Sequence, residues 1–360
     1  MQIESHEVIV LDVPLERPFM GIAEARHVVL RLRTDDGLEG LGWVGWFRPT
    51  MIPSLAAAVD AVASELTGLD PNHRLRTMET VSSMVDVVWW GPGISRYVEA
   101  MVEFALYDLA GKAVDLPVAA LLGAGGIESV PAYASQHLWR DWPLGDLDSG
   151  AGALAAEGWR AMKFRIGANA HGCDEVDRAR VVREAVGEHV EVMVDVNEGW
   201  DLARTKEVAP LLEPYRLAWL EDPIDHRDLD GYRRLVGTVG IPITHGEYHK
   251  DIHAFGRIAA DRSADVVMID AHHVGGVDPW IKAAHACELA HLPVATHLSP
   301  EIGVHLGAAT PNCRTVEYMD WSVALFNERL QLDAEGRLVV PHGPGWGVTL
   351  DEDLIRRRRV

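Results

Sequence analysis

From Val130 onward, short apolar runs alternate with helix-like segments, and this alternation constrains the fold more than any other feature of the chain. The runs are rich in Val, Ile and Leu, which is typical of strands buried on both faces of a parallel sheet. Strands that alternate with helices in this way indicate an α/β fold, here a TIM-type (β/α)7-8 barrel. The expected strands span residues 130–135, 161–166, 190–196, 217–220, 241–244, 266–269, 294–295 and 315–316.

The residues before the barrel follow a different pattern. Strand-like stretches at 7–13, 27–34 and 38–43 precede helical patterns at 52–66, 75–88 and 94–112. Strands followed by helices indicate a small α+β domain, which we place at residues 1–125. The barrel is then expected over residues 126–329. Residues 330–360 are too polar and turn-rich for another strand–helix unit, so we expect a separate C-terminal segment there.

Composition narrows the possible partners and the compartment. The 33 Lys and Arg residues against 54 Asp and Glu residues give a net charge of −21, which argues against binding to nucleic acid or to an anionic membrane. The Arg run at 356–359 is therefore expected to be a solvated terminus. No apolar stretch reaches about 18 residues. The sequence after Met1 does not resemble a signal peptide, and the three cysteines suggest no disulfide framework. We therefore expect a cytoplasmic protein.

Ionisable residues stand at the ends of the expected barrel strands. The chemistry of such barrels lies at the C-terminal ends of the strands, so these side chains are expected to meet at one mouth. From Asp195 to Glu317, neighbouring members are 20 to 27 residues apart, which is about one strand–helix unit. The full set is Lys163, Arg165, Asp195, Glu221, Glu247, Asp270, His297 and Glu317.

Three successive carboxylates, Asp195, Glu221 and Glu247, form the strongest candidate site. Unpaired carboxylates at one mouth repel one another and raise one another's pKa, and a divalent cation resolves this conflict. Ligation by oxygen alone favours Mg²⁺, Mn²⁺ or Ca²⁺ over zinc. We predict that these three residues bind a metal. The alternative is that each carboxylate pairs with a buried Lys or Arg.

Asp270 and His297 form the second candidate site, at neighbouring strand ends. An Asp bonded to one imidazole nitrogen fixes the tautomer and raises the basicity of the other nitrogen, so we predict a catalytic base. The alternative is a histidine that only fills the core. Four further histidines near the same rim are given supporting or structural roles: His245, His272, His273 and His305.

Lys163 and Arg165 form the third candidate site. Strand alternation puts both side chains on one face of their strand. Two cations opposite a metal can hold a carboxylate substrate, and a desolvated Lys can also act as a base, whereas Arg cannot. The alternative is that both cations pair with the metal-binding carboxylates.

Taken together, these residues resemble the motifs of the enolase superfamily, and within it the mandelate racemase/muconate lactonizing enzyme group. The resemblance extends over nearly the whole chain, and residues 101–123 look like the end of that family's capping domain. Its three metal-ligand motifs match Asp195-Val196-Asn197, Glu221-Asp222-Pro223 and Gly246-Glu247. Its Asp–His dyad matches Asp270 and His297, and its acid that binds the substrate carboxylate matches Glu317.

The resemblance implies a Mg²⁺-dependent enzyme, with Mn²⁺ as an alternative metal. In this family a base removes the α-proton of a carboxylate substrate and the metal stabilises the enediolate. Lys163 and Arg165 match a Lys-x-Lys element, but Arg165 replaces the second lysine and cannot serve as a base. Racemisation needs a base on each face of the α-carbon, whereas β-elimination needs only His297.

We therefore expect a lyase, an acid-sugar dehydratase that yields a 2-keto-3-deoxy acid. Three alternatives stay open. The first is a cycloisomerase (lactonizing enzyme) that acts on a sugar acid or its lactone. The second is an epimerase that uses Lys163 as its second base. The third is a barrel that binds a sugar acid without turnover.

The resemblance also implies that the capping domain closes over the site and sets specificity. The matching loops span about residues 15–26 and 43–50, where Arg17, Trp46 and Arg48 are expected to contact a polyol or a second carboxylate. Asn197 is a further expected substrate contact. Residues 341–348 resemble the stretch that rejoins the capping domain. The expected partner is a small sugar acid, and the resemblance also implies a homo-oligomer.

Overall fold

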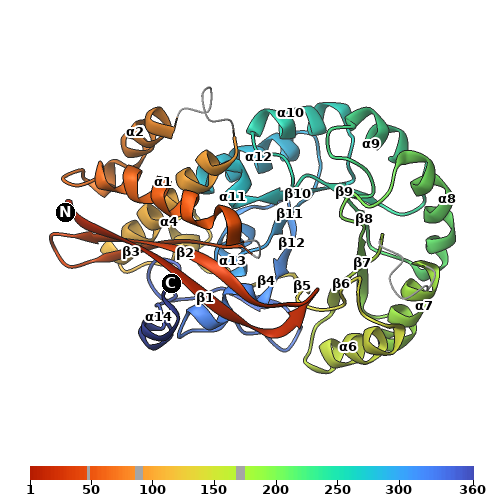
Figure 1. Ribbon diagram of the computed structural model, residues 1–360. Coiled ribbons are helices and arrows are strands. Elements are labelled where there is room, and N and C mark those ends of the chain that lie inside the picture. The colour runs from red at the N-terminus through yellow and green to blue at the C-terminus, as the bar shows by residue number, and fades with distance from the viewer. Residues whose placement is uncertain (47–48, 86–91, 168–174) are drawn as a thin grey trace.

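The structure is a computed structural model that describes residues 1–46, 49–85, 92–167 and 175–360 (Figure 1). Within these residues, eight parallel strands form a closed barrel in which each strand pairs with the next along the chain. The predicted barrel is confirmed. Its strands are β5 (Ala132–Ala134), β6 (Ala161–Arg165), β7 (Glu191–Asp195), β8 (Leu220–Glu221), β9 (Ile243–His245), β10 (Val266–Asp270), β11 (Val294–His297) and β12 (Cys313–Tyr318).

Helices follow the strands and cover the outside of the barrel (Figure 1). Several of them start at an Asp whose side chain accepts the backbone N–H three residues later, at 2.7 Å for Asp201, 2.9 Å for Asp228 and 3.0 Å for Asp251. Such caps satisfy N–H groups that have no partner within the helix. The outer helices are α6 (Leu144–Ala156), α7 (Glu175–Val186), α8 (Leu202–Leu212), α9 (Leu229–Leu235), α10 (Ile252–Asp261), α12 (Val277–Leu289) and α13 (Pro300–Ala309).

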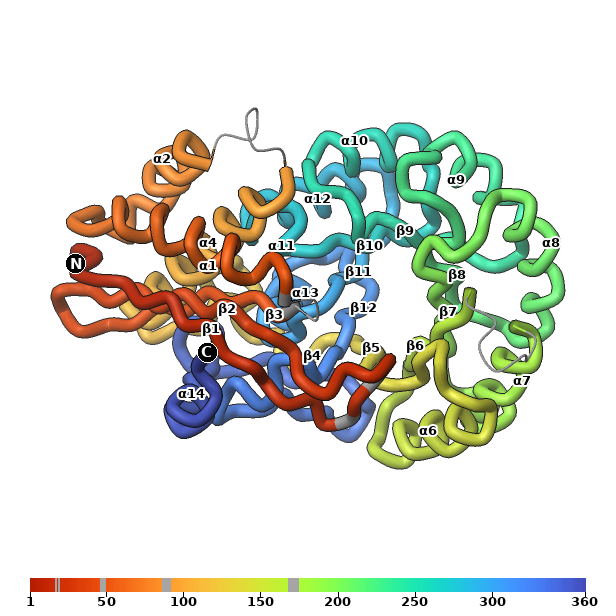
Figure 2. The backbone as a smooth tube through the Cα atoms, in the orientation of Figure 1, coloured from red at the N-terminus to blue at the C-terminus, as the bar shows by residue number. Residues whose placement is uncertain are grey.

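The first part of the chain forms an antiparallel sheet of β1 (Ile3–Phe19), β2 (Ile22–Thr34) and β3 (Glu39–Trp46). Helices α1 (Ile52–Ser64) and α4 (Ile94–Ala113) pack against this sheet, and α2 (Arg74–Val85) packs on α4. Strands followed by helices were expected here, but β1 and β2 are longer than predicted. They form a hairpin whose tip lies near β5 and β6 (Figure 2). At the tip, the backbone N–H of Met20 donates to Asp141 Oδ2 at 3.1 Å.

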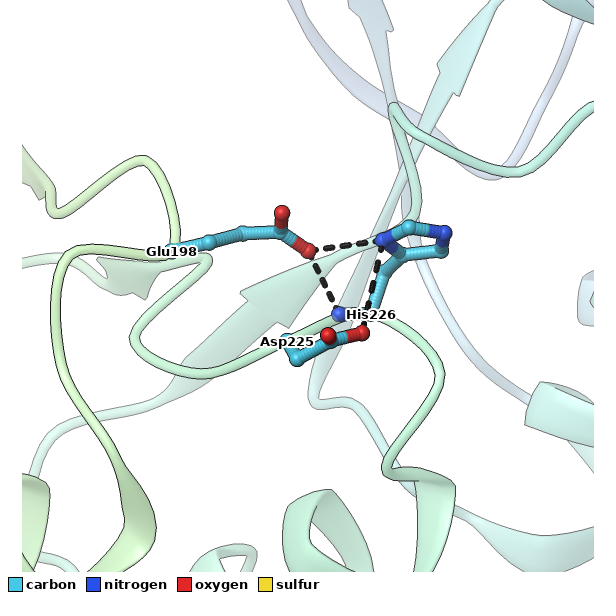
Figure 3. Close-up of side chains that lie close together, drawn as sticks. All are labelled: Glu198, Asp225 and His226. Atoms are coloured by element: carbon cyan, nitrogen blue, oxygen red, sulfur yellow. Dashed lines mark hydrogen bonds and ion pairs between the residues drawn. The ribbon is translucent and has the colours of Figure 1, made fainter.

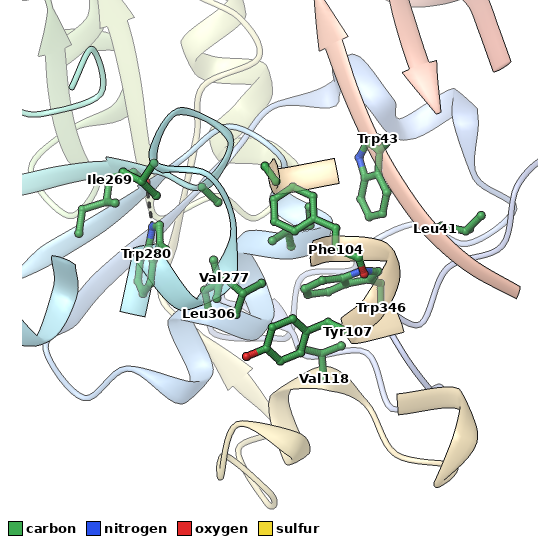
Figure 4. Close-up of a cluster of buried hydrophobic side chains, with 14 of the residues drawn as sticks. Leu41, Trp43, Phe104, Tyr107, Val118, Ile269, Val277, Trp280, Leu306 and Trp346 are labelled. Atoms are coloured by element: carbon green, nitrogen blue, oxygen red, sulfur yellow. Dashed lines mark hydrogen bonds between the residues drawn. The ribbon is translucent and has the colours of Figure 1, made fainter. Parts of the chain in front are cut away.

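The C-terminal segment joins the barrel to the first domain. Strand β13 (Leu338–Val339) pairs with β4 (Ser129–Val130), and helix α14 (Glu352–Arg358) packs on β1. Trp346 lies in a core with Trp43 and Phe104, and its Nε1 donates to the Phe104 carbonyl at 3.0 Å (Figure 4). Domain boundaries after residues 125 and 329 stay a prediction, since these contacts cross both of them.

The terminal Arg run pairs with acidic side chains. Arg359 Nη1 lies 2.7 Å from Glu7, and Arg358 Nη1 lies 2.6 Å from Glu24. Both arginines are partly exposed, as expected for a solvated terminus. Among the helices of the described ranges, none is both long and apolar enough to cross a membrane.

Gly42 allows strand β3 to lie directly on helix α4. A Cβ at this position would overlap the backbone carbonyl of Met101. We expect Gly42→Ala to lower the free energy of unfolding by about 1–3 kcal/mol, because the added methyl group would collide with the backbone of α4 and could fit only if strand and helix moved apart. Gly152→Ala in α6 is the matched control, since a Cβ there meets no atom within 4 Å. It should stabilise the protein by about 0.5–1 kcal/mol. Urea unfolding of Gly42→Ala and Gly152→Ala tests this prediction. Equal changes in the free energy of unfolding would contradict it.

Candidate active site

The polar strand ends meet at one mouth of the barrel, as predicted. In the parallel register, Asp195 lies between Arg165 on β6 and Glu221 on β8, and Asp270 pairs with His297 on β11. A cavity of about 510 Å³ opens above them, a size typical of small-molecule sites. All predicted residues of the strand ends line it except Glu221, which lies fully buried below: Lys163, Arg165, Asp195, Glu247, Asp270, His297 and Glu317.

Buried carboxylates gather at the ends of β8 and β9. Glu221, Asp222 and Glu247 place oxygens within 4.8 Å of one another. Both carboxylate oxygens of Asp222 and one of Glu247 are buried and accept no hydrogen bond from the described residues. Burial, followed in the case of Asp222 by the charge of Glu247, raises the pKa of Asp222 well above its usual value. Burial also raises the pKa of Glu221 to about 8. A buried cluster in which carboxylates outnumber the neighbouring cations fits a hard divalent cation.

Asp195, the third predicted ligand, is oriented by its neighbour Asn197. The backbone N–H of Asn197 donates to Asp195 Oδ1 at 2.7 Å, and its side-chain Nδ2 donates to Oδ2 at 2.6 Å. Arg140 in turn donates to Asn197 Oδ1. Asn197 lines the cavity, so the structure gives it a positioning contact with Asp195 and leaves its predicted substrate contact as a proposal.

Lys163 lies among the carboxylates instead of opposite them. Its Nζ is 2.5 Å from Glu221 Oε1, 3.0 Å from Glu317 Oε1 and 3.8 Å from Asp195 Oδ2. Burial by itself lowers the pKa of Lys163, but the charges of Glu221 and Glu317 raise it well above its usual value. Lys163 is therefore a cation in this arrangement. These contacts agree with the alternative given above for Lys163, in which the lysine pairs with the predicted metal-binding carboxylates.

Arg165 uses its guanidinium mainly for internal contacts. Nη1 donates to the carbonyls of Ser135 at 2.9 Å and His137 at 3.3 Å, and Nη2 donates to Ser135 Oγ at 2.7 Å. The guanidinium also stacks 3.8 Å from the ring centre of Trp139. These contacts hold the loop after β5, so a role in binding a substrate carboxylate stays a proposal.

The Asp–His pair has the expected geometry. His297 Nδ1 lies 2.6 Å from Asp270 Oδ2, and Nε2 lies 3.2 Å from Glu247 Oε2. Burial lowers the pKa of His297, but the charge of Glu247 and the bond to Asp270 outweigh it and raise the pKa to about 10. Asp270 Oδ1 accepts the backbone N–H of His273 at 2.8 Å, which fixes the carboxylate in place. His297 Nε2 is thus directed into the carboxylate side of the cavity.

The other rim histidines have structural contacts. His245 stacks on Tyr232 with ring centres 3.9 Å apart, and His305 lies 3.1 Å from both the Ala119 amide and the Trp346 carbonyl. His272 and His273 line the cavity. His272 Nε2 contacts the Trp43 carbonyl at 2.7 Å, and His273 Nε2 contacts Tyr97 Oη at 2.7 Å. The last two therefore connect the barrel to the first domain.

The predicted capping contacts fall outside the described parts of the chain. This applies to Arg48 as a whole and to the side chains of Arg17 and Trp46. Seven described residues of the first domain line the cavity, and five of them lie in the predicted loops 15–26 and 43–50, although none of the seven was singled out by its chemistry. They are Met20, Ile22, His27, Trp43, Val44, Gly45 and Tyr97.

Two further residues near the carboxylates escaped prediction. Trp219 Nε1 donates to Glu221 Oε2 at 2.7 Å, and the period of two along β8 puts both on the same face. Asp222 follows Glu221 but turns back toward the same site because its φ is +40°. Left-handed backbone is costly for non-glycine residues and often marks functional sites. It occurs directly after three barrel strands here, at Asn197, Glu198, Asp222, Leu298 and Ser299.

Glu198, Asp225 and His226 form a second polar cluster at the mouth (Figure 3). Glu198 Oε1 accepts the backbone N–H of His226 at 2.5 Å and lies 2.7 Å from its Nδ1. Asp225 accepts the backbone N–H of Arg227 at 2.9 Å and its Nε at 2.8 Å. The carboxylates thus have protein partners, and the cluster ties the loop after β7 to the loop after β8.

Buried Glu301 in α13 predicts a pH effect on stability. Its carboxylate accepts from Ser322 Oγ at 3.0 Å, and burial raises its pKa from 4.5 to about 7. The folded protein then binds this proton more tightly than the unfolded chain. The resulting stabilisation of the folded state is fully present below pH 4.5 and is lost as the pH rises through 7. We expect Glu301→Gln to raise stability at pH 8 by on the order of 2–3 kcal/mol relative to its effect at pH 4.5. Urea unfolding at both pH values tests this, and a pH-independent difference would contradict it.

The fold and the site define a class of protein: a (β/α)8-barrel enzyme whose N-terminal α+β domain contributes to the cavity at the barrel mouth. Two family models match the chain. The mandelate racemase/muconate lactonizing enzyme N-terminal domain matches residues 3–123, and the enolase C-terminal domain-like family matches residues 147–354. The chain therefore belongs to the mandelate racemase/muconate lactonizing enzyme family of the enolase superfamily, which confirms the predicted resemblance.

Relatives of this chain catalyse more than one reaction. The chain is 28% identical over 340 residues to L-talarate/galactarate dehydratase of Salmonella typhimurium, covering 93% of this chain and 83% of that protein. It is 26% identical over 373 residues to D-galactarolactone cycloisomerase of Agrobacterium fabrum, covering 97% and 96%. A crystal structure of L-talarate dehydratase from a Polaromonas species, complexed with Mg and L-glucarate, has a TM-score of 0.90 and 30% identity over 100% of this chain and 98% of that one.

Proposed function

We propose that this enzyme is a divalent-metal-dependent hydro-lyase that converts a sugar acid into a 2-keto-3-deoxy acid. The observation that carries the proposal is the Asp270–His297 pair, whose Nε2 faces the buried carboxylates across the cavity. A site that only binds an acid does not need a positioned base. L-talarate/galactarate dehydratase among the relatives supports the same reaction type.

We further propose that Asp195, Glu221 and Glu247 bind Mg²⁺, or alternatively Mn²⁺. The buried carboxylate cluster, in which neither oxygen of Asp222 accepts a hydrogen bond from the described residues, and the Mg in the Polaromonas crystal structure both support the proposal. Asp222 adds negative charge beside the ligands. When bound, the cation supplies Lewis-acid stabilisation of negative charge on the substrate carboxylate. Lys163 lies beside this position and is proposed to orient the same carboxylate. Burial raises the pKa of Glu317, but the charges of Lys163 and His297 outweigh it and lower the pKa to about 2, so Glu317 is proposed to act as an anion that holds Lys163 at 3.0 Å.

His297 is proposed to act first as a base and then as an acid. Asp270 holds Nδ1 in its protonated form, so Nε2 takes the α-proton of the substrate. A cation held by Glu247 would offset part of the negative charge that raises the pKa of His297, and Nε2 could then accept this proton. The protonated His297 then returns the proton to the β-hydroxyl, the C–O bond breaks and water leaves. The resulting enol tautomerises to the 2-keto-3-deoxy acid.

A cycloisomerase is the second candidate. Its reaction also needs only one base, and D-galactarolactone cycloisomerase is similar to the chain over 97% of its length. Epimerisation is disfavoured, because Lys163 is held as a cation by two carboxylates and Arg165 cannot deprotonate.

The test is a product screen. The purified protein with Mg²⁺ is incubated with a library of sugar acids and their lactones, and 2-keto acids are detected with semicarbazide. A 2-keto product from an open-chain sugar acid supports the dehydratase and identifies its substrate. A 2-keto product from a lactone alone supports the cycloisomerase, because ring opening by β-elimination gives the same kind of enol. Absence of any 2-keto product, together with α-proton exchange in D₂O or consumption of a lactone, would refute dehydration and favour the isomerase.

A further inference from the structure

Among the described residues, no group donates a hydrogen bond to the carboxylate of Asp222. Both of its carboxylate oxygens are buried, and the exposed fraction of the residue is 0%. A carboxylate that loses its water without gaining hydrogen bonds is strongly unfavourable inside a protein. Burial and three neighbouring carboxylates raise the pKa of Asp222 well above its usual value, and Lys163 offsets only part of this rise. The described part of the chain thus leaves the charge of this side chain without adequate compensation.

The carboxylates beside Asp222 are better satisfied. Both oxygens of Asp195 accept N–H groups of Asn197, at 2.7 and 2.6 Å. Of the two oxygens of Glu221, one lies 2.5 Å from a lysine ammonium and the other accepts an indole N–H at 2.7 Å. Polar groups of the described residues therefore reach every oxygen of these two predicted ligands, but neither oxygen of Asp222. Of the three side chains, Asp222 has the most capacity to bind a cation.

The backbone directs Asp222 into the carboxylate cluster. In a regular strand, the side chain after Glu221 would point to the opposite face. A φ of +40° at Asp222 turns its carboxylate back, so that oxygens of Asp222, Glu221 and Glu247 lie within 4.8 Å of one another. Left-handed backbone is costly for a residue with a Cβ and is often retained for a function. Oxygens on opposite sides of one bound Mg²⁺ or Ca²⁺ ion are about 4–5 Å apart, so this spacing suits a shared cation.

We propose that Asp222 is a fourth metal-binding carboxylate of this enzyme and acts with Asp195, Glu221 and Glu247 on one divalent cation. The inference rests on the metal site of the proposed function and goes beyond the three ligands that the family resemblance implies. A cation at this position would supply the counter-charge that the described residues do not give to Asp222. The fourth negative charge should in turn tighten the binding of the cation.

Asp222→Asn tests the contribution to affinity. Asn retains the size of the side chain and tolerates left-handed backbone, but it carries no charge. Calorimetric titration of the full-length protein with Mg²⁺ should show an affinity at least about tenfold weaker than that of the native protein. The matched control is Glu301→Gln, which also removes a buried carboxylate but lies outside the cavity lining, and it should bind Mg²⁺ like the native protein. Equal affinity of Asp222→Asn and the native protein would overturn the inference.

Asp222→Cys tests direct contact with the metal. A thiolate ligand favours softer ions than Mg²⁺. The folded variant, checked by circular dichroism, should therefore lose affinity for Mg²⁺ and bind Cd²⁺ with a thiolate-to-metal absorption band in the ultraviolet. Titration of the native protein, which carries Cys173, Cys287 and Cys313, gives the background. A band no stronger than this background would show that position 222 does not touch the metal and would overturn the inference.

Failure of the proposed reaction can be told apart from failure of this inference. A native protein that binds Mg²⁺ more tightly than Asp222→Asn but yields no 2-keto product would support the inference and overturn only the proposed reaction. A native protein that binds no divalent cation would overturn both.

Discussion

Replacing Glu221 by Gln is expected to abolish binding of the divalent metal and, with it, catalytic activity. The side chain supplies a full negative charge at the centre of the carboxylate cluster, and an amide supplies none. Loss of outer-shell partners alone typically weakens metal affinity 10–100-fold, so loss of a ligand should exceed about 100-fold. Calorimetric titration with Mg²⁺ measures the affinity, and the product screen measures the activity.

The fold should survive this change. Gln retains an acceptor for Trp219 Nε1, and Lys163 keeps Glu317 at 3.0 Å. The matched control is Glu103→Gln, which neutralises an equally buried carboxylate in α4, near Arg74 and away from the cavity. The control should lose stability but retain Mg²⁺ affinity. If Glu221→Gln bound Mg²⁺ as tightly as the native protein, the assignment of Glu221 as a ligand would be wrong.

Replacing His297 by Asn is the change with the second-largest expected effect. A positioned general base contributes typically 10²–10⁴-fold to a rate, so kcat should fall by about that factor. Mg²⁺ affinity should change little, because the proposed ligands are carboxylates. Exchange of the substrate α-proton in D₂O, followed by NMR, should disappear together with product formation. This combination separates loss of the base from loss of the metal.

His305→Gln is the control for the base. His305 is as buried as any histidine in the cavity wall, but it contacts the Ala119 amide and the Trp346 carbonyl and lies outside the cavity lining. The variant is expected to unfold more easily and still to exchange the α-proton. Wild-type exchange in His297→Asn would refute the assignment of the base.

Much of the fold could be predicted because the barrel repeats one simple rule. Each buried strand is a short run of apolar residues, each is followed by a helix, and parallel strands end on the same side. A residue at the end of an apolar run can therefore be assigned to the C-terminal mouth of the barrel from the sequence. This reasoning placed Asp195, Asp270 and His297 at one mouth, and the register of β7, β10 and β11 agrees.

Other features depended on contacts between distant segments. The lengths of β1 and β2 exceed the prediction because their hairpin gains partners on the barrel, where Met20 reaches Asp141, 121 residues away. The pattern of neighbouring residues in the sequence does not predict a contact over this separation. The resemblance implied that residues 15–26 and 43–50 lie at the site, but the sequence did not single out Met20 and Trp43, because their apolar side chains carry no chemical motif.

The barrel, the domain that precedes it and the family follow from the amino-acid sequence, because strand period and the spacing of polar strand ends are local properties of the chain. The pairing of the polar groups depends on the tertiary structure. It places Lys163 against Glu221 and Glu317, leaves both oxygens of Asp222 without a hydrogen bond from the described residues, and turns Arg165 toward Ser135. Hydrogen bonds and ion pairs are sensitive to differences of a few tenths of an ångström in the distance between two groups, and here those groups lie on segments that are far apart in the chain.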